Sequence, residues 1–168
     1  MEKKILEKEL LTAKGYDRLT AEIKKITLED RTKIIEEVQT AREHGDLKEN
    51  AEYHAAKEKQ RLLDKKLEEL NSLLADSQII DPSKLPHDIV SFGSTVTIVD
   101  LDTEEEATYT IVGSYEADVD RDIISYNSPL AKVLLGKPVG EELEATLPGG
   151  VKEFEILSIE YRSEIFES

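Results

Sequence analysis

Apolar residues recur at helical spacing through the first half of the chain, and charged residues fill the positions between them. Residues 12–77 contain no proline and only the glycines at positions 15 and 45. The apolar stripes on either side of position 45 are too narrow for a globular core and suit one helix lying on another. Thr12 is a suitable N-cap for the first helix. The apolar positions are Leu19, Ile23, Ile26, Ile34, Val38 and Ala41 before the second glycine, and Leu63, Leu67, Leu70 and Leu74 after it.

Gly45 separates the two helical stripes. A glycine just past a helix end takes a positive φ without strain, and a short connection makes two helices antiparallel neighbours. Each arm has roughly 30 residues, which corresponds to about 45 Å at ~1.5 Å per residue. The pattern therefore predicts a long antiparallel helical hairpin, a coiled coil whose turn lies far from the other ends of its arms.

The pattern changes after Asp81-Pro82 and Leu85-Pro86, which break the helix. Alternation of apolar and polar residues predicts a series of short strands beyond this point. Ser128-Pro129 predicts the start of one short helix, which ends at Gly136. The predicted strands cover residues 95–99, 107–112, 122–126, 143–147 and 151–159.

Charge divides the chain at about the same place. The net charge is -15, of which residues 1–85 carry -2 and residues 86–168 carry -13. Such an acidic balance argues against a stand-alone nucleic-acid binder, because those proteins carry a basic surface. Pattern and charge together predict an α+β chain with a helical domain at 1–80, a linker at 81–88 and a β-rich domain at 89–168.

The absence of cysteine excludes disulfides, thiolate metal sites and a cysteine nucleophile. No apolar run approaches the ~20 residues that a membrane span needs. The N-terminal residues Met1–Lys4 lead into charged sequence without the apolar region of a signal peptide. We therefore expect a cytoplasmic protein that makes no membrane contact.

The segment between the two arms carries two acids three residues apart, Asp46 and Glu49. In one interpretation Asp46 is the N-cap of the second helix and Glu49 completes a capping box, with the cap contributing about 1 kcal/mol. In the other, the two carboxylates form an incomplete Mg²⁺ site, since Mg²⁺ prefers six oxygens and takes one or two carboxylates together with other ligands. The interpretations are compatible, because a carboxylate has more lone-pair positions than a cap uses.

Basic residues follow the tip along the second helix. Lys57, Arg61 and Lys65 are four residues apart, and Arg42 precedes the turn on the first helix. This basic stripe is either an ordinary solvated helix face or a surface that contacts nucleic-acid phosphates, and the spacing alone fits both.

The residues from Ala41 to Lys57 resemble the coiled-coil tip of the Gre family of bacterial transcript cleavage factors. The residues beside the tip acids, Leu47-Lys48 and His54-Ala55-Ala56, resemble the GreA branch of the family more than the GreB branch. The chain departs from the family where a proline is common in the first arm, since it has Arg31-Thr32-Lys33-Ile34 there. Further matching residues extend over nearly the whole chain: Leu11-Thr12, Gly15, Leu19, Phe92–Val96, Ile124-Ser125, Asn127–Ala131, Gly136-Lys137 and Pro148–Gly150.

The resemblance implies a function and a site. Members of the family bind bacterial RNA polymerase, with an FKBP-like C-terminal domain (a curved antiparallel sheet against a short helix) at the rim of the secondary channel and the hairpin inside it. On this basis Asp46 and Glu49 are expected to share a Mg²⁺ ion with the polymerase, whose own active site then cleaves the 3′ end of backtracked RNA and rescues arrested complexes. The expected nucleic-acid contacts are Arg42, Lys57, Arg61 and Lys65.

The same resemblance implies that the chain is not itself an enzyme. It is expected to act as an accessory factor that completes a Mg²⁺-dependent hydrolytic site of the polymerase. Two carboxylates alone hold Mg²⁺ weakly, so tight Mg²⁺ binding by the free chain is not expected. Little binding to free nucleic acid is expected either, given the acidic charge.

Three other functions compete with this one. The implied FKBP-like domain suggests a chaperone or prolyl-isomerase-like binding module, although fold analogy is weak evidence for function. A Gre-like inhibitor would occupy the same channel without promoting cleavage, and the presence of both tip acids argues against it. An autonomous nuclease would need a further cluster of metal ligands, whereas His44, His54 and His87 are expected to be surface residues.

Overall fold

The computed structural model describes residues 9–45 and 50–167 of the chain. These residues form two compact units: the segment from Tyr16 to Ser77 is one, and the described residues on either side of it are the other. Residues 9–15 thus group with the C-terminal part rather than with a helical domain at 1–80. A two-stranded sheet accounts for this grouping, because β1 (Glu9–Leu11) pairs with β2 (Ser77–Ile79) and Ile80 N donates to Leu11 O at 2.8 Å.

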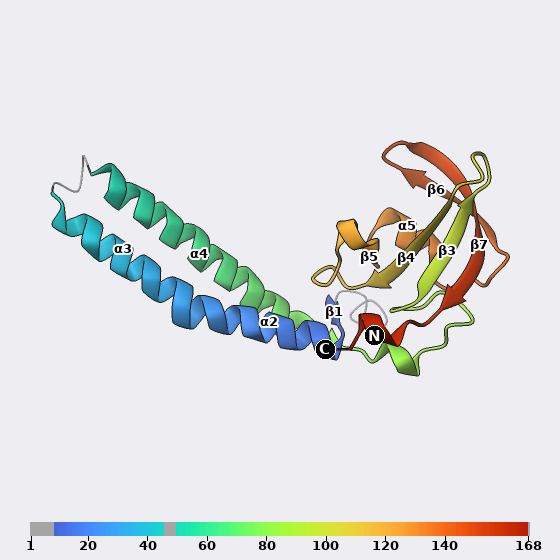
Figure 1. Ribbon diagram of the computed structural model, residues 1–168, viewed down its shortest axis with the longest axis horizontal. Helices are drawn as coiled ribbons and strands as arrows, with labels where there is room; N and C mark the ends of the chain where they lie inside the picture. The colour runs from blue at the N-terminus through green and yellow to red at the C-terminus, as the bar shows by residue number, and fades with distance from the viewer. Residues whose placement is uncertain (1–8, 46–49, 168) are drawn as a thin grey trace. The chain divides into compact units, whose positions relative to one another are not determined.

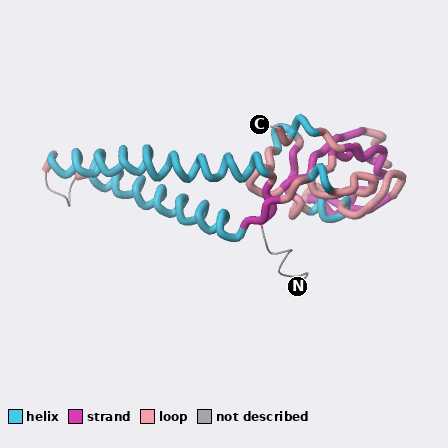
Figure 2. Tube along the Cα trace, turned by 90° about the horizontal axis from the view of Figure 1, so that it is seen from below, coloured by secondary structure: helices cyan, strands magenta, loops and turns pink. Residues whose placement is uncertain are grey.

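The helical unit is the predicted antiparallel hairpin (Figure 1, Figure 2). Its first arm runs through α2 (Ala13–Lys25), a π-helical segment (Ile26–Asp30) and α3 (Arg31–Glu43), and α4 (Ala51–Asp76) returns alongside α3. Thr12 caps α2 as predicted, since Gly15 N donates to Thr12 Oγ1 at 3.1 Å. No helix within the described part of the chain is long and apolar enough to cross a membrane.

The π-helical segment explains an irregular spacing in the first arm. Ile26 and Ile34 are eight residues apart, which is one more than a heptad, and Leu28 between them is 61% exposed. A π-helical turn holds about one residue more than an α-helical turn, so both isoleucines stay on the seam between the arms. In an uninterrupted α-helix the apolar positions beyond residue 30 would be rotated by about 100°.

Deleting Leu28 is therefore expected to leave the hairpin about as stable as before, because the deletion restores a spacing of seven between the two isoleucines. The thermal midpoint of the helical circular dichroism signal should change by less than about 2 °C. Glu68 provides the matched control, since it is an exposed residue of the uninterrupted α4. Deleting it rotates part of the seam by about 100° and should lower the midpoint by several degrees; equal losses would contradict this explanation of the π-helical segment.

The C-terminal strands form one five-stranded sheet in the order β5-β4-β3-β7-β6 (Figure 1). Three neighbouring pairs are antiparallel, whereas β5 lies parallel to β4, so the sheet is antiparallel-rich rather than wholly antiparallel. The α+β fold class is confirmed, and all five strands lie close to the predicted ranges. Their bounds are β3 (Thr95–Asp100), β4 (Glu106–Val112), β5 (Ile123–Ser125), β6 (Glu142–Leu147) and β7 (Gly150–Glu160).

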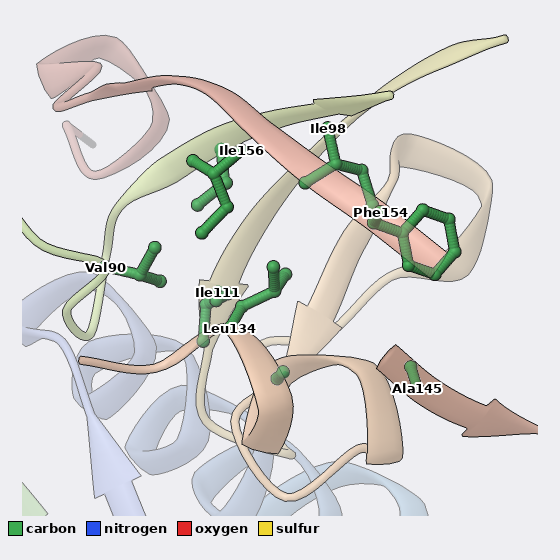
Figure 3. Close-up of a cluster of buried hydrophobic side chains, with 9 residues drawn as sticks. Val90, Ile98, Ile111, Leu134, Ala145, Phe154 and Ile156 are labelled. Carbon is green, nitrogen blue, oxygen red and sulfur yellow. The ribbon is translucent and has the colours of Figure 1, made fainter. Parts of the chain in front are cut away.

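A short helix, α5 (Pro129–Leu134), covers one face of this sheet. Ser128 caps it as the Ser-Pro pair predicts, because Ala131 N donates to Ser128 Oγ at 3.3 Å. Figure 3 shows Leu134 of α5 beside Ile111 of the sheet, and both side chains are fully buried. The core of this unit consists of Val90, Val96, Ile98, Ile111, Ala131, Leu134, Ala145, Phe154 and Ile156.

Glu116, to which no sequence pattern points, holds the beginning of α2. Its carboxylate accepts one hydrogen bond from Thr12 N at 2.9 Å and another from the Thr12 hydroxyl. A Cβ atom at Gly15 would lie 2.2 Å from Glu116 Cδ, so the glycine leaves room for this carboxylate. The spacing of Thr12 and Gly15 is thereby explained by a partner about a hundred residues later in the chain.

Candidate functional site

The first arm ends at the tip with a regular helix terminus. α3 stops at Glu43, and His44 N donates to Ala41 O at 3.2 Å to close the last turn. Gly45 follows with φ +138°, a conformation that only glycine adopts without strain. The prediction that Gly45 ends the first helix is confirmed.

The second arm does not begin where the capping box predicts. The N-cap of α4 is Asn50 rather than Asp46, since Tyr53 N donates to Asn50 Oδ1 at 3.1 Å and the helix starts at Ala51. The assignment of Asp46 as N-cap and Glu49 as third helical residue was therefore wrong. Asp46 and Glu49 themselves lie outside the described residues.

Asn50 makes a second contact that explains why it, and not an acid, caps α4. Its Nδ2 donates to Ala41 O on the first arm at 2.5 Å, across nine residues of sequence. A side-chain amide accepts and donates at the same time, whereas an ionised carboxylate only accepts. The hydrogen bond to a carbonyl of the opposite helix therefore favours Asn50 over an acid as the N-cap of α4.

The predicted metal site cannot be assembled from the described residues alone. Within residues 9–45 and 50–167, no three histidine, aspartate or glutamate side chains are grouped closely enough to hold a metal ion. The two carboxylates assigned to Mg²⁺ fall in the segment between these ranges. Carboxylate oxygens are ligands that Mg²⁺ prefers, so the donor set fits the ion, and the Mg²⁺ role stays a prediction.

The three histidines differ in their surroundings. His44 and His54 are exposed, as predicted, and His54 meets the Tyr53 ring edge-on with centroids 5.6 Å apart. His87 is half-buried. Its Nε2 donates to Pro82 O and its Nδ1 shares a hydrogen bond with the Ser94 hydroxyl, each at 2.6 Å. A carbonyl oxygen only accepts, so Nε2 is the donor to Pro82 O.

Cross-helix ion pairs show which residues of the two arms share a face. The seam also includes two half-buried polar residues, Asp30 on the first arm and Gln60 on α4. Arg31 and Asp64 each follow a seam residue by one position, and Arg31 Nε lies 3.5 Å from Asp64 Oδ1. Glu37 and Lys59 each precede a seam residue, and Lys59 Nζ lies 3.5 Å from Glu37 Oε2. Residues one position after a seam residue therefore lie on one face of the hairpin. Residues one position before a seam residue lie on the opposite face.

The structure brings three of the four predicted nucleic-acid contacts onto one face. Arg42, Lys57 and Arg61 each follow a seam residue by one position, and all three are exposed. Lys65 is also exposed, but it is two positions from the seam residues on either side of it and points away from the partner arm.

Part of the positive charge on this face is already paired with an acidic side chain. Arg61 donates two hydrogen bonds of 3.0 and 2.7 Å to the Glu58 carboxylate, and these bonds lower the pKa of Glu58. Lys57 Nζ donates to Gln60 Oε1 at 3.2 Å. The basic stripe is thus partly neutralised by an acid of its own helix, which sequence spacing alone does not reveal.

The opposite face of the hairpin is electrostatically mixed. It carries a groove of about 590 Å³ between α3 and α4, lined by small residues and by both lysines and glutamates. Mixed charge gives this groove no preference for phosphate over a cation. Of the two faces, the one with Arg42 and Lys57 is therefore better suited to a nucleic acid.

Comparison with known proteins covers nearly the whole chain. Residues 9–79 match the family model described as "Transcription elongation factor, N-terminal", and residues 85–161 match "Transcription elongation factor, GreA/GreB, C-term". The curated transcription elongation factor GreA of Aliarcobacter butzleri is 54% identical over 94% of this chain and 98% of its own length. The GreA of Helicobacter hepaticus is 50% identical over 95% and 98%. Among solved structures, Gfh1 of Thermus thermophilus is 27% identical over 92% and 99%, with a TM-score of 0.43.

Proposed function

The chain belongs to the GreA/GreB family of transcription elongation factors, and on that premise we propose that it stimulates RNA cleavage by a bacterial RNA polymerase. In this proposal the hairpin enters the secondary channel, and the polymerase's own active site cleaves the 3′ end of backtracked RNA. The observation that carries the proposal is a long two-helix arm with Asp46 and Glu49 in the segment between its helices. α4 alone has 26 residues, or about 39 Å of helix, which is enough to deliver side chains into a deep channel.

The two tip acids would supply carboxylate oxygens to a Mg²⁺ ion that the polymerase also binds. In a two-metal active site of a polymerase or nuclease, the metal ions stabilise charge on the attacking and leaving oxygens of the phosphodiester. The chain offers only two of the six ligands that Mg²⁺ prefers, so the polymerase and the RNA must supply the others. The chain is therefore proposed as an accessory factor, and alone it should show no RNA hydrolysis.

The distribution of charge supports different partners for the hairpin and the C-terminal part. Residues 86–168 carry a net charge of -13, so nucleic acid repels the C-terminal part. The hairpin is close to neutral and has one face with exposed basic residues. We expect RNA contacts to be made by that face of the hairpin, and a protein surface of the polymerase to be bound by the C-terminal part.

The test is a transcript-cleavage assay on halted elongation complexes of a bacterial RNA polymerase. Adding the chain with Mg²⁺ should release short 3′ RNA fragments and allow the shortened transcripts to be extended again. Binding without fragments would support an inhibitor that occupies the same channel. Rapid catalysis of prolyl isomerisation by the full chain, together with no effect on the halted complexes, would support the chaperone-like alternative.

The proposed role of the basic face predicts a salt-dependent effect of charge reversal. Lys57→Glu should lower the efficiency of stimulated cleavage about three- to tenfold at low salt, and the loss should shrink as the salt concentration rises. Lys59→Glu is the matched control, because Lys59 pairs with Glu37 on the opposite face and an exposed pair contributes little stability. Equal losses in the two variants would contradict a specific RNA contact at Lys57.

A further inference from the structure

We propose that a small pocket in the C-terminal unit binds an arginine side chain presented by a protein partner. The pocket has a volume of about 240 Å³, and its lining residues come from the segments 12–13, 79–82 and 161–167. All three segments belong to the same compact unit. This inference goes beyond the proposed function and does not depend on it, since it concerns neither the tip of the hairpin nor its basic face.

One wall of the pocket consists of two parallel aromatic rings. Tyr161 and Phe166 stack with their centroids 5.7 Å apart and their planes at 4°, and His87 stacks with Tyr161 at 5.1 Å. His87 is itself held by its hydrogen bond to the carbonyl of Pro82, a buried residue that also lines the pocket. Phe166 N donates to Ser163 O at 3.0 Å. The wall is therefore formed before a ligand arrives, which lowers the entropy lost on binding.

Two acidic side chains, Asp81 and Glu167, also line the pocket. Asp81 Oδ1 accepts hydrogen bonds from the Ser83 hydroxyl at 2.6 Å and from Ser83 N at 3.0 Å, and these bonds lower the pKa of Asp81. Asp81 is therefore ionised at neutral pH, and these bonds leave further lone-pair positions of its carboxylate for a ligand. Burial and the charges of Asp81 and Glu167 raise the pKa of Tyr161, so both carboxylates act on the aromatic wall.

Two basic residues next to the lining segments are engaged elsewhere. Lys14 Nζ donates to Ile165 O at 3.4 Å, and Arg162 donates hydrogen bonds of 3.1 and 2.7 Å to Glu160 Oε1. Among the described residues that line the pocket itself, none is basic. The negative charge of the pocket therefore favours a cation from another molecule.

The size and chemistry of the pocket fit arginine better than other ligands. Its volume of about 240 Å³ is below the range of roughly 300–1,000 Å³ typical of sites for drug-sized molecules. A metal ion would lack ligands, because no three histidine, aspartate or glutamate side chains are grouped to hold one in the part of the chain that the structure describes. A guanidinium stacks on aromatic rings and pairs with carboxylates, whereas an ammonium is a strongly hydrated point charge. The methylene stem of the arginine would lie against the apolar side chains of Ile79 and Ile80.

The surroundings of the pocket favour an arginine within a protein surface over a free small molecule. Residues 86–168 carry a net charge of -13, which attracts a basic surface. Ile79 lines the pocket and is 50% exposed, so it offers apolar area that a partner's surface would cover. Arginine is also enriched among the residues that contribute most of the binding energy at protein interfaces.

The test measures the binding of capped tripeptides to the full chain by NMR shifts of its backbone amides. The peptide glycine-arginine-glycine, acetylated and amidated, should shift the amides of Ile80, Tyr161 and Phe166 with a Kd on the order of 1 mM. Citrulline has nearly the shape of arginine without its charge, and the citrulline peptide should bind at least about tenfold more weakly. Lysine and leucine peptides should also bind more weakly. Equal or tighter binding of any of these three peptides would overturn the assignment to arginine.

Variants of the chain test whether the peptide occupies this pocket. Asp81→Asn should weaken binding of the arginine peptide about fivefold, because asparagine still accepts from Ser83 but has no charge. Asp88→Asn is the matched control, since Asp88 is an exposed acid that is not among the lining residues, and it should bind like wild type. Phe166→Leu should weaken binding about threefold, with the amide spectrum of the five-stranded sheet as a check on folding. Equal losses in the two aspartate variants, or shifts that spread over the acidic surface without saturating, would overturn the proposal in favour of general attraction by net charge.

Discussion

The double variant Asp46→Asn with Glu49→Gln is expected to lose stimulated RNA cleavage by about 100-fold or more, while its binding to the polymerase stays unchanged. Each amide has nearly the size of the acid that it replaces, but neither carries the negative charge that makes a carboxylate a good Mg²⁺ ligand. The helix should survive the change, because Asn50 and not Asp46 caps α4. Loss of activity can therefore be assigned to the missing ligands rather than to unfolding of the tip.

The matching control neutralises two acids that flank the tip. Glu43 and Glu52 are exposed residues at the end of α3 and in the first turn of α4. The variant Glu43→Gln with Glu52→Gln changes the net charge by the same amount and should keep nearly full activity. Both double variants would be compared by the rate of fragment release from halted complexes and by circular dichroism. If the tip variant retains more than about half of the wild-type rate, the two acids do not act as ligands.

Gly113→Ala is expected to destabilise the C-terminal unit by about 3 kcal/mol. A Cβ atom at this buried position would lie 1.9 Å from Leu10 O and 3.0 Å from Leu10 C. These are backbone atoms of β1, so the clash can be relieved only by moving that strand. Moving β1 would disturb fully buried Leu11 and the hydrogen bond from Ser114 N to Glu9 Oε1, which is 2.9 Å long.

Calorimetric unfolding of the full chain would measure this loss. The transition that includes the β-sheet should shift to lower temperature by about 12–24 °C, because about 1 kcal/mol corresponds to roughly 4–8 °C in a unit of this size. Gly149→Ala is the matched control in the same unit, since a Cβ atom there would meet nothing within 4 Å. An unchanged transition in Gly113→Ala would show that β1 can move away from Gly113 at little cost.

Local patterns predicted most of the regular structure. The apolar stripes predicted both arms of the hairpin, and the alternation from residue 95 onward predicted all five strands of the larger sheet. The short helix was predicted from Ser128-Pro129, which supplies a hydroxyl cap and a preset φ at the right positions. Each of these signals lies within a few residues of the structure that it specifies, so it can be recognised without knowledge of any distant contact.

Long-range contacts explain the features that local patterns missed. β1 and β2 have three residues each, too few to show a period, and they form only because residues far apart in sequence pair. Glu116 reaches Thr12 across 104 positions, and Gly113 is required by the approach of Leu10. The spacing of eight between Ile26 and Ile34 was visible in the sequence, but only the requirement that both face the opposite arm makes it a π-helical turn.

The amino-acid pattern thus specified both arms of the hairpin, the five strands of the larger sheet, the short helix and the presence of two acids between the arms, because helical and strand periodicity are properties of neighbouring residues. It could not specify which residue caps the second arm. Asp46 and Asn50 are both good caps locally, and the choice depends on Ala41 O, which the folded hairpin alone brings within 2.5 Å of Asn50 Nδ2. An amide is favoured at this position because it can donate to that carbonyl while it accepts a hydrogen bond from a backbone N–H of the helix. An ionised carboxylate can only accept.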